Sequence, residues 1–200
     1  MNISNSEIRA KARAALGNEI FGRTWLMALL VGLIISAILG AANSLCMGLG
    51  SLLLSGPLYV GLYKTYLKIA QGDQDVKIET AFEGCYSFGP NLVLGIMHTL
   101  YILLWTLLFI IPGIIKSYSY ALAYYIKAEH PEYGWRECLN ESEKMMQGNK
   151  MRLFILHLSF IGWALLSIFT FGLASLWVNA YQQTATAIFY EELKKEQLYQ

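Results

Sequence analysis

Hydrophobic residues gather in long runs along this 200-residue chain, and polar residues fill the linkers between the runs. The apolar runs extend from Thr24 to Ala42, from Ser51 to about Ile69, from Asn91 to Ile111, from Ile114 to Ile126, from Leu153 to Ile168 and from Phe171 to Tyr190. About 20 apolar residues in a helix cross the roughly 30 Å hydrocarbon core of a bilayer. The pattern therefore predicts an all-α, polytopic helical membrane protein with about six transmembrane helices, paired as three hairpins.

The fourth run is short for a crossing. At about 1.5 Å per residue, Ile114 to Ile126 reaches only roughly 20 Å into a core of about 30 Å. It must extend into Ala128 or dip only partly across the bilayer. Pro112-Gly113 is expected to break the helix ahead of it, because proline removes a backbone donor and glycine is flexible.

Each predicted hairpin follows a polar segment with helical character. Near the N-terminus, Ser4 and Glu7 have the spacing of a capping box. Apolar residues recur behind it at helical spacing, at Ile8, Ala12, Ala15, Leu16 and Ile20. Arg9, Lys11 and Arg13 lie outside this stripe, which is typical of a helix on a membrane surface. We therefore expect a cytoplasmic amphipathic helix before each hairpin.

The positions of the basic residues predict the orientation. Most basic residues fall in the tails and linkers on one side of the predicted membrane. They are Arg9, Lys11, Arg13, Arg23, Lys68, Lys77, Lys127, Arg136, Lys144, Lys150, Arg152, Lys194 and Lys195. The three opposite turns, around Leu45, Pro112 and Phe171, contain no charge. Because basic residues concentrate in cytoplasmic loops, we expect a multi-pass protein of the cell membrane with both termini in the cytoplasm.

Composition agrees with a membrane protein and narrows the chemistry. Hydrophobic residues make up 56% of the chain and charged residues 14%, with a mean hydropathy of +0.42. Soluble domains have about a quarter of their residues charged. The net charge is only +1 with both signs mixed, so no nucleic-acid partner is expected. Three cysteines without CxxC or Cys/His spacing predict neither a disulfide framework nor a zinc site, and no cofactor is expected.

The three hairpins suggest an internal repeat within a single membrane domain of residues 1–200. Gly22, Gly89 and Gly148 each end a polar segment just before an apolar run. His98 and His157 each follow their glycine by nine residues, although the first unit lacks the histidine. The proposed modules are residues 4–70, 75–128 and 132–192. Ordinary helical-hairpin statistics are the alternative explanation.

Three stretches carry a resemblance to a known family. They are LLWTLLFIIPGIIK from Leu103 to Lys116, LSFIGW from Leu158 to Trp163, and TATAIFY from Thr184 to Tyr190. Together they resemble an uncharacterised bacterial integral-membrane protein family, the domain-of-unknown-function family numbered nine hundred and seventy-five. That family is distantly similar to the membrane domain of glycerophosphodiester phosphodiesterases. Asn179-Ala180-Tyr181 departs from the Pro-Tyr expected at that point. The resemblance implies a fold and a membrane location, and it implies no activity.

Lys116 is the first candidate ligand-binding residue. It follows Pro112-Gly113 by a few residues, near the predicted outer face, and no Asp or Glu occurs from Gly84 to Ala128. An unpaired ammonium group in such a segment must reach lipid headgroups, bind backbone carbonyls or meet an anion. The anion could be a lipid head or a substrate carboxylate.

Five further residues are candidates for the same site. His98 and His157 lie inside predicted spans, where a neutral imidazole can hydrogen-bond across helices. The alternative for them is a proton relay, although the spans contain no acids, and two histidines alone make a weak metal site. Tyr118 and Tyr181 belong either to interfacial aromatic belts or to a cleft for a lipid or hydrophobic peptide. Gln182 falls in a polar cluster that we expect to face protein.

The sequence favours binding over catalysis. It contains no nucleophile elbow, phosphate loop, paired catalytic carboxylates or HExxH motif. We therefore expect a non-enzymatic scaffold, accessory subunit or lipid-binding and lipid-handling factor. Its partners are membrane lipids and, as an alternative, a membrane protein or a second copy of the chain. The rival hypothesis is a small oligomeric transporter or channel for an anionic or amphipathic solute.

Overall fold

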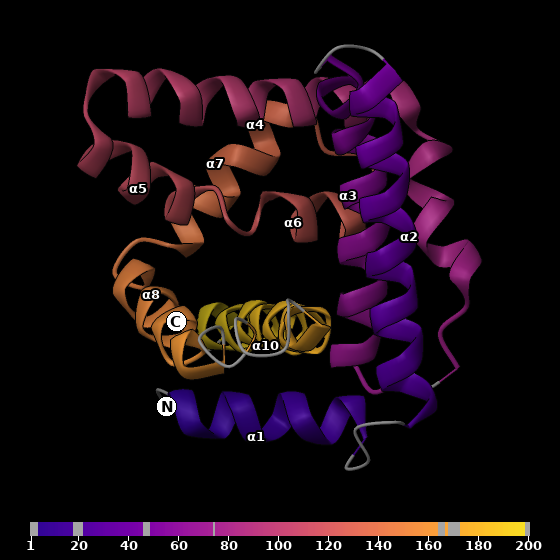
Figure 1. Cartoon of the computed structure of the whole chain (residues 1–200). Helices are drawn as coiled ribbons and strands as arrows, with labels where there is room; N and C mark the ends of the chain where they lie inside the picture. Colours follow the sequence, from indigo (N-terminus) through magenta and orange to yellow (C-terminus); the bar gives the residue numbers. More distant parts are fainter. Residues whose placement is uncertain are drawn as a thin grey trace. The chain divides into compact units, whose positions relative to one another are not determined.

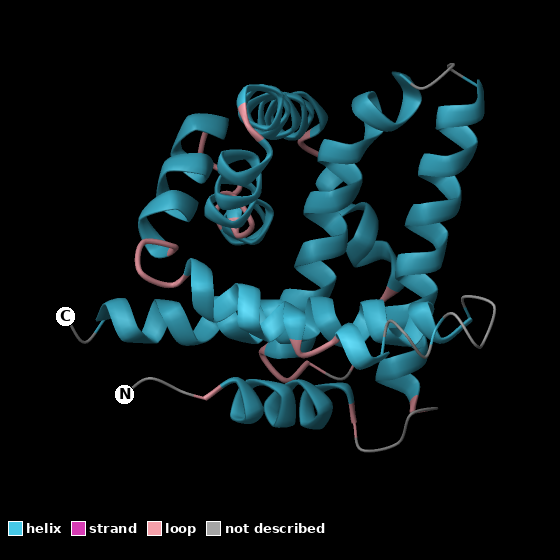
Figure 2. Cartoon of the chain, turned by 60° about the vertical axis from the view of Figure 1, so that its left-hand side comes forward, coloured by secondary structure: helices cyan, strands magenta, loops and turns pink. Residues whose placement is uncertain are grey.

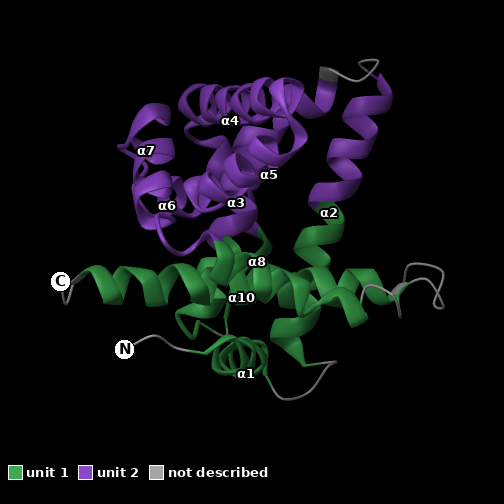
Figure 3. Cartoon of the chain, turned by 90° about the vertical axis from the view of Figure 1, so that its left-hand side faces the viewer, with its two compact units in different colours: residues 1–34, 65–78, 151–200 green, residues 35–64, 79–150 purple. Residues whose placement is uncertain are grey.

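The computed structural model describes residues 4–17, 22–45, 49–73, 75–163, 167 and 173–198. Over these residues the chain forms helices and no strand, so the predicted all-α class is confirmed (Figure 1, Figure 2). The chain divides into two compact units (Figure 3). Unit 1 comprises Met1–Ile34, Thr65–Ile78 and Met151–Gln200, and unit 2 comprises Ile35–Lys64 and Glu79–Lys150.

Unit 1 is built around α1 and α10. It contains α1 (Asn5–Leu16), α8 (Lys150–Leu158), α10 (Leu173–Leu198), the first part of α2 (Arg23–Leu45) and the last part of α3 (Leu49–Ala70). The capping box at the start of α1 is confirmed. The backbone N–H of Glu7 donates to Ser4 Oγ at 3.3 Å, and the backbone N–H of Ser4 donates to the Glu7 carboxylate at 2.8 Å.

The apolar stripe of α1 is covered by protein. Ile8, Ala12 and Leu16 are all fully buried, and α1 packs along α10 (Figure 1). The prediction that this stripe rests on a membrane surface is therefore wrong, because the last helix of the chain takes the place that was assigned to lipid. Ala15 is half-buried, and Ile20 lies outside the described residues.

Polar contacts fix α1 to α10. Lys11 Nζ lies 2.8 Å from Glu192 Oε1, and Lys195 Nζ lies 3.2 Å from the same oxygen. Burial alone would raise the pKa of Glu192, but its bonds with these two lysines outweigh that effect and hold the pKa below its ordinary value. The side of α1 that carries Lys11 is therefore electrically neutralised by α10.

Unit 2 packs its helices through glycines. It contains the 3₁₀ helix η1 (Ile78–Cys85), α4 (Phe88–Leu108), α5 (Ile110–Ser119), α6 (Ala123–Glu129) and α7 (Trp135–Met145), with the remaining parts of α2 and α3. A Cβ atom at Gly56 of α3 would collide with the backbone carbonyl of Asn91 on α4. Likewise, a Cβ at Gly61 would collide with the carbonyl of Ala81 on η1. Only glycine allows these backbones to approach so closely.

The break between α4 and α5 lies earlier than the sequence suggests. Phe109 has an extended backbone, with φ −158° and ψ 140°, and it separates the two helices. Pro112 lies in the first turn of α5, where backbone N–H groups have no helical partner and proline is tolerated. The predicted break at Pro112-Gly113 is therefore wrong by a few residues. Gly113 instead lets α5 fold closely against Thr106 of α4.

Two helices of the described chain are long and apolar enough to cross a membrane. They are Arg23–Leu45, with a hydropathy of 2.4, and Phe88–Leu108, with a hydropathy of 1.7. The finer expectation of six crossings stays a prediction. The run from Ile114 to Ile126 is divided between α5 and α6, so it forms no single helix that could cross. Residues 46–48 of the predicted turn around Leu45 and the whole of the predicted turn around Phe171 lie outside the described residues.

Candidate functional site

The structure distributes the six predicted site residues over the two units. Those in unit 2 are His98 on α4 and Lys116 and Tyr118 on α5. Those in unit 1 are His157 on α8 and Tyr181 and Gln182 on α10.

Lys116 has a carboxylate partner, contrary to the sequence-based expectation. Its Nζ atom lies 2.6 Å from Glu143 Oε1 on α7, and 5.4 Å from the ring centroids of both Trp105 and Tyr120. The partner lies 27 residues further along the chain, beyond the acid-free segment. The sequence predicts Lys116 near the outer face, and it predicts the linker with Arg136 and Lys144, which also contains Glu143, on the cytoplasmic side. Those two placements are incompatible with an ion pair.

His98 belongs to an aromatic cluster in unit 2. Its ring centroid lies 4.9 Å from that of Tyr124, which stacks on Tyr63 at 5.4 Å with an interplanar angle of 5°. Tyr63 comes from α3 and Tyr124 from α6, so the cluster joins three helices. Tyr118 is half-buried on α5. His98 therefore packs among these rings and also hydrogen-bonds to the backbone of Tyr120, the C-cap residue of α5.

His157 makes the cross-helix hydrogen bond that the sequence predicts. Its Nε2 atom lies 3.2 Å from Thr186 Oγ1 on α10. The Thr186 hydroxyl donates to the carbonyl of Gln182 at 2.9 Å, so its hydrogen is already used. The imidazole therefore donates to Thr186. This arrangement joins α8 to α10.

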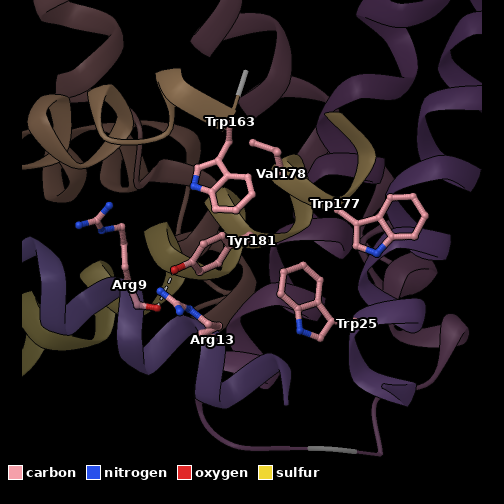
Figure 4. Close-up of a pocket in the computed structure, with 7 residues that line it drawn as sticks. All are labelled: Arg9, Arg13, Trp25, Trp163, Trp177, Val178 and Tyr181. Carbon is pink, nitrogen blue, oxygen red and sulfur yellow. Dashed lines mark hydrogen bonds between the residues drawn. The ribbon is translucent and has the colours of Figure 1, made fainter. Parts of the chain in front are cut away.

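Tyr181 lines a cavity of about 390 Å³ in unit 1 (Figure 4). The cavity is lined by two arginines, three tryptophans, a valine and this tyrosine, namely Arg9, Arg13, Trp25, Trp163, Trp177, Val178 and Tyr181. We call it the Arg–Trp pocket. The first and last helices of the chain both contribute to the pocket. Helix α1 supplies the two arginines, and α10 supplies Trp177 and Tyr181.

Hydrogen bonds and ring contacts hold the walls of the Arg–Trp pocket. The Tyr181 hydroxyl donates to the backbone carbonyl of Arg9 at 2.9 Å, which Figure 4 marks with a dashed line. The Tyr181 ring lies 5.9 Å from the ring of Trp25 and 5.0 Å from that of Phe160, measured between centroids. Trp25 Nε1 donates to the carbonyl of Gly17 at 3.0 Å. The rings are therefore positioned before any ligand arrives.

The guanidinium groups of the Arg–Trp pocket are not neutralised by the described part of the chain. Within it, neither Arg9 nor Arg13 forms an ion pair with a carboxylate, whereas Lys11 and Arg152 in the same unit do. The Nε atom of Arg9 is buried and has no hydrogen-bond partner among the described residues. A buried donor without a partner costs free energy.

Of the six candidate ligand-binding residues predicted from the sequence, only Tyr181 lines this pocket. Arg9 and Arg13 are four residues apart and therefore share one face of α1, a signal that was available. Trp25, Trp163 and Trp177 are far apart in sequence, and only the fold brings them to one cavity.

Comparison with known proteins places the chain in a family. The family model described as a protein of unknown function, DUF975, matches residues 1–116 and 107–197. The chain belongs to the DUF975 family. No curated protein and no solved structure matches it. The similarity to the membrane domain of glycerophosphodiester phosphodiesterases and the bacterial origin stay predictions. Because DUF975 is described without a function, membership of the family assigns no activity to this chain.

Proposed function

We propose that this DUF975 protein is a non-enzymatic, multi-pass protein of the cell membrane that binds an anionic amphiphile in the Arg–Trp pocket. The ligand class is an anionic phospholipid, with its phosphate at the arginines and its first methylene groups against the indoles. The observation that carries the proposal is the meeting of two arginines, neither paired with a described carboxylate, and three tryptophans at one cavity.

The chemistry of the lining suits a phosphate group attached to an apolar chain. Guanidinium groups present planar sets of donors that match phosphate and carboxylate oxygens. Tryptophan offers a large apolar surface with one polar edge. A volume of about 390 Å³ falls within the usual range of small-molecule pockets, roughly 300–1,000 Å³. It is large enough for a headgroup region and too small for two whole acyl chains.

The position of the pocket along the chain supports an interfacial location. Trp25 stands in the first turn of α2, the more hydropathic of the two candidate membrane spans. Tryptophan and arginine are favoured at the level of lipid headgroups, at the ends of such helices. The basic tails and linkers place this end of α2 on the cytoplasmic side in our proposal. The pocket would then open among the headgroups of the inner leaflet.

The rival transporter hypothesis loses the observation on which it depended. It required an uncompensated cation at Lys116 to attract an anionic solute, and Lys116 is paired with Glu143 at 2.6 Å. Partners other than lipids stay predictions from the sequence.

Native mass spectrometry of the full chain, purified in a mild detergent, tests the proposal. We expect wild-type protein to retain an anionic phospholipid and the double variant Arg9→Gln/Arg13→Gln to lose it. The matched control is Lys116→Gln, which removes a cation beside aromatic rings in unit 2 and should leave retention unchanged. Circular dichroism confirms that each variant is folded. Absence of bound lipid in the wild type, or equal retention by the double variant, would contradict the proposal.

A further inference from the structure

We propose that the hairpin formed by α4 and α5 inserts its tip into one leaflet of the bilayer and returns to the side from which it came. The tip is defined as residues 103–115. The exposed apolar surface of the tip fits the acyl chains of lipids. The inference concerns a different surface from the Arg–Trp pocket and does not depend on lipid binding there.

The apolar side chains of the tip are exposed on all sides. From Leu107 to Ile111, every residue is an apolar one whose exposed fraction lies between 62% and 83%. Successive helical residues are rotated by about 100°, so adjacent exposed residues at the end of α4 and the start of α5 point in different directions. A groove for one protein partner would leave another face polar. A surface that is apolar all round indicates a fluid apolar solvent on every side.

The tip hides the polar groups that it contains. Thr106 Oγ1 donates to the carbonyl of Ile102 in its own helix at 2.7 Å. Gly113 brings α5 against Thr106, which narrows the hairpin. No Asp, Glu, Lys or Arg occurs from residue 84 to residue 115. Hydroxyl groups bonded to their own helix and an absence of charge are what a hydrocarbon environment requires.

The ion pair between Lys116 and Glu143 marks the depth to which the hairpin reaches. Glu143 belongs to α7, a helix whose neighbouring Glu141–Lys144 pair is 42% and 65% exposed. Because α7 carries charges on its exposed face, it belongs in water or among headgroups, and it holds Lys116 at that level. Trp105 lies beside the ammonium group, as interfacial tryptophan does.

The distance from this ion pair to the turn is too short for a crossing. Ile110 precedes Lys116 by six positions, which corresponds to about 9 Å of helix. One leaflet contributes about 15 Å of hydrocarbon. The turn at Phe109 therefore lies within the near leaflet and does not reach the water beyond the far one. The inference replaces the full crossing for which α4 is long and apolar enough, and the uncharged outer turn that the sequence suggested around Pro112.

Cysteine accessibility in the full chain tests the insertion. The background carries Cys46→Ala, Cys85→Ala and Cys138→Ala, and single cysteines are then introduced by Phe109→Cys or Glu132→Cys. Glu132 is 65% exposed in the loop before α7 and serves as the aqueous control. Right-side-out and inverted membrane vesicles are treated with a charged, impermeant maleimide. Labelling in detergent confirms that each cysteine is reactive, and Leu107→Cys replaces Phe109→Cys if the latter accumulates poorly.

We expect Glu132→Cys to react from one face only and Phe109→Cys to react at least about tenfold more slowly from both faces, because hydrocarbon excludes charged reagents. A fluorophore attached at residue 109 should then be quenched by lipids that carry spin labels on their acyl chains. Rapid labelling of Phe109→Cys from the face opposite to Glu132→Cys would show a full crossing and overturn the inference. Rapid labelling from the same face would show a tip in water and overturn it as well. Either result leaves lipid retention by the Arg–Trp pocket as a separate outcome.

Discussion

Two regions of this molecule place cations beside aromatic rings, and they differ in one respect. In unit 2, Lys116 lies 5.4 Å from the ring of Trp105 and 2.6 Å from a Glu143 oxygen. In unit 1, Arg9 and Arg13 line a cavity with three indoles, and no described carboxylate pairs with them. The first cation is satisfied within the protein. The second pair offers its donors to a ligand. Composition alone does not distinguish a structural cation from a binding one; the nearest carboxylate does.

The same contrast occurs within α1 itself. Lys11 pairs with Glu192 of α10, whereas Arg9 and Arg13 face the cavity. Among the described residues, cations that pair with a carboxylate and cations that do not therefore alternate along this short helix. Removing each kind should have a different consequence: loss of stability for the paired cations and loss of binding for the free ones.

The largest expected effect is on lipid affinity when both arginines of the pocket are replaced. Each charged hydrogen bond contributes about 1.5–3 kcal/mol, and about 1.4 kcal/mol corresponds to a tenfold change in affinity. Arg9→Gln/Arg13→Gln should therefore weaken binding of an anionic phospholipid at least about tenfold. The measurement is a titration of protein in phosphatidylcholine nanodiscs with phosphatidylglycerol. An affinity equal to that of the wild type would remove the distinction between the two regions.

The next effect concerns the stability of unit 2. Lys116→Gln or Glu143→Gln should each lower the free energy of unfolding by about 1 kcal/mol. The pair is partly buried, so its contribution lies between that of a surface ion pair and that of a fully buried one. The two changes together should cost less than the sum of their separate effects, because they remove one interaction. Denaturant unfolding in detergent measures the three values. Strict additivity would show that the two residues do not interact.

A smaller effect is expected from the tyrosine that connects α10 to α1. Tyr181→Phe removes the hydrogen bond to the Arg9 carbonyl, a contribution of about 0.5–1.5 kcal/mol. Lipid affinity should fall a few-fold, because Arg9 is held less firmly. Tyr118→Phe on α5 is the matched control and should leave the affinity unchanged. If Tyr118→Phe lowered the lipid affinity and Tyr181→Phe did not, the same nanodisc titration would place the ligand in unit 2.

The smallest effect is on the pH dependence of the contact between α1 and α10. The pKa of Glu192 is lowered in the folded protein, so the carboxylate form is favoured by folding. The resulting stability is present above the ordinary pKa of 4.5 and is lost as the pH falls through the lower folded-state value. Amide hydrogen exchange in α1 should therefore increase on acidification below about pH 4.5, after correction for intrinsic rates. Glu192→Gln should abolish this response.

Local patterns in the sequence predict much of the secondary structure. The capping box of Ser4 and Glu7, the apolar stripe of α1 and the long apolar helix α2 follow from short-range rules and are present in the structure. The helix break was misplaced at Pro112, because proline is a strong signal and its tolerance in a first turn depends on where the helix begins. Phe109, the residue that breaks the helix, has no such local signal.

Long-range contacts set the limits of sequence reasoning. Glu143 lies 27 residues from Lys116, and nothing in either neighbourhood predicts their pairing. Burial of the α1 stripe requires α10, which comes from the other end of the chain. The Arg–Trp pocket has the same origin. Its arginine spacing was visible, but its tryptophans come together only when α1, α2 and α10 pack.

Tryptophan quenching by brominated lipids tests the central claim most directly. The chain has five tryptophans, and the changes Trp105→Phe and Trp135→Phe leave only those of the Arg–Trp pocket. In phosphatidylcholine nanodiscs, a small fraction of brominated phosphatidylglycerol should quench their fluorescence more strongly than the same fraction of brominated phosphatidylcholine. Adding Arg9→Gln/Arg13→Gln should abolish the difference. Equal quenching by the two lipids, or a difference that survives the loss of both arginines, would contradict the proposal of an anionic-lipid site.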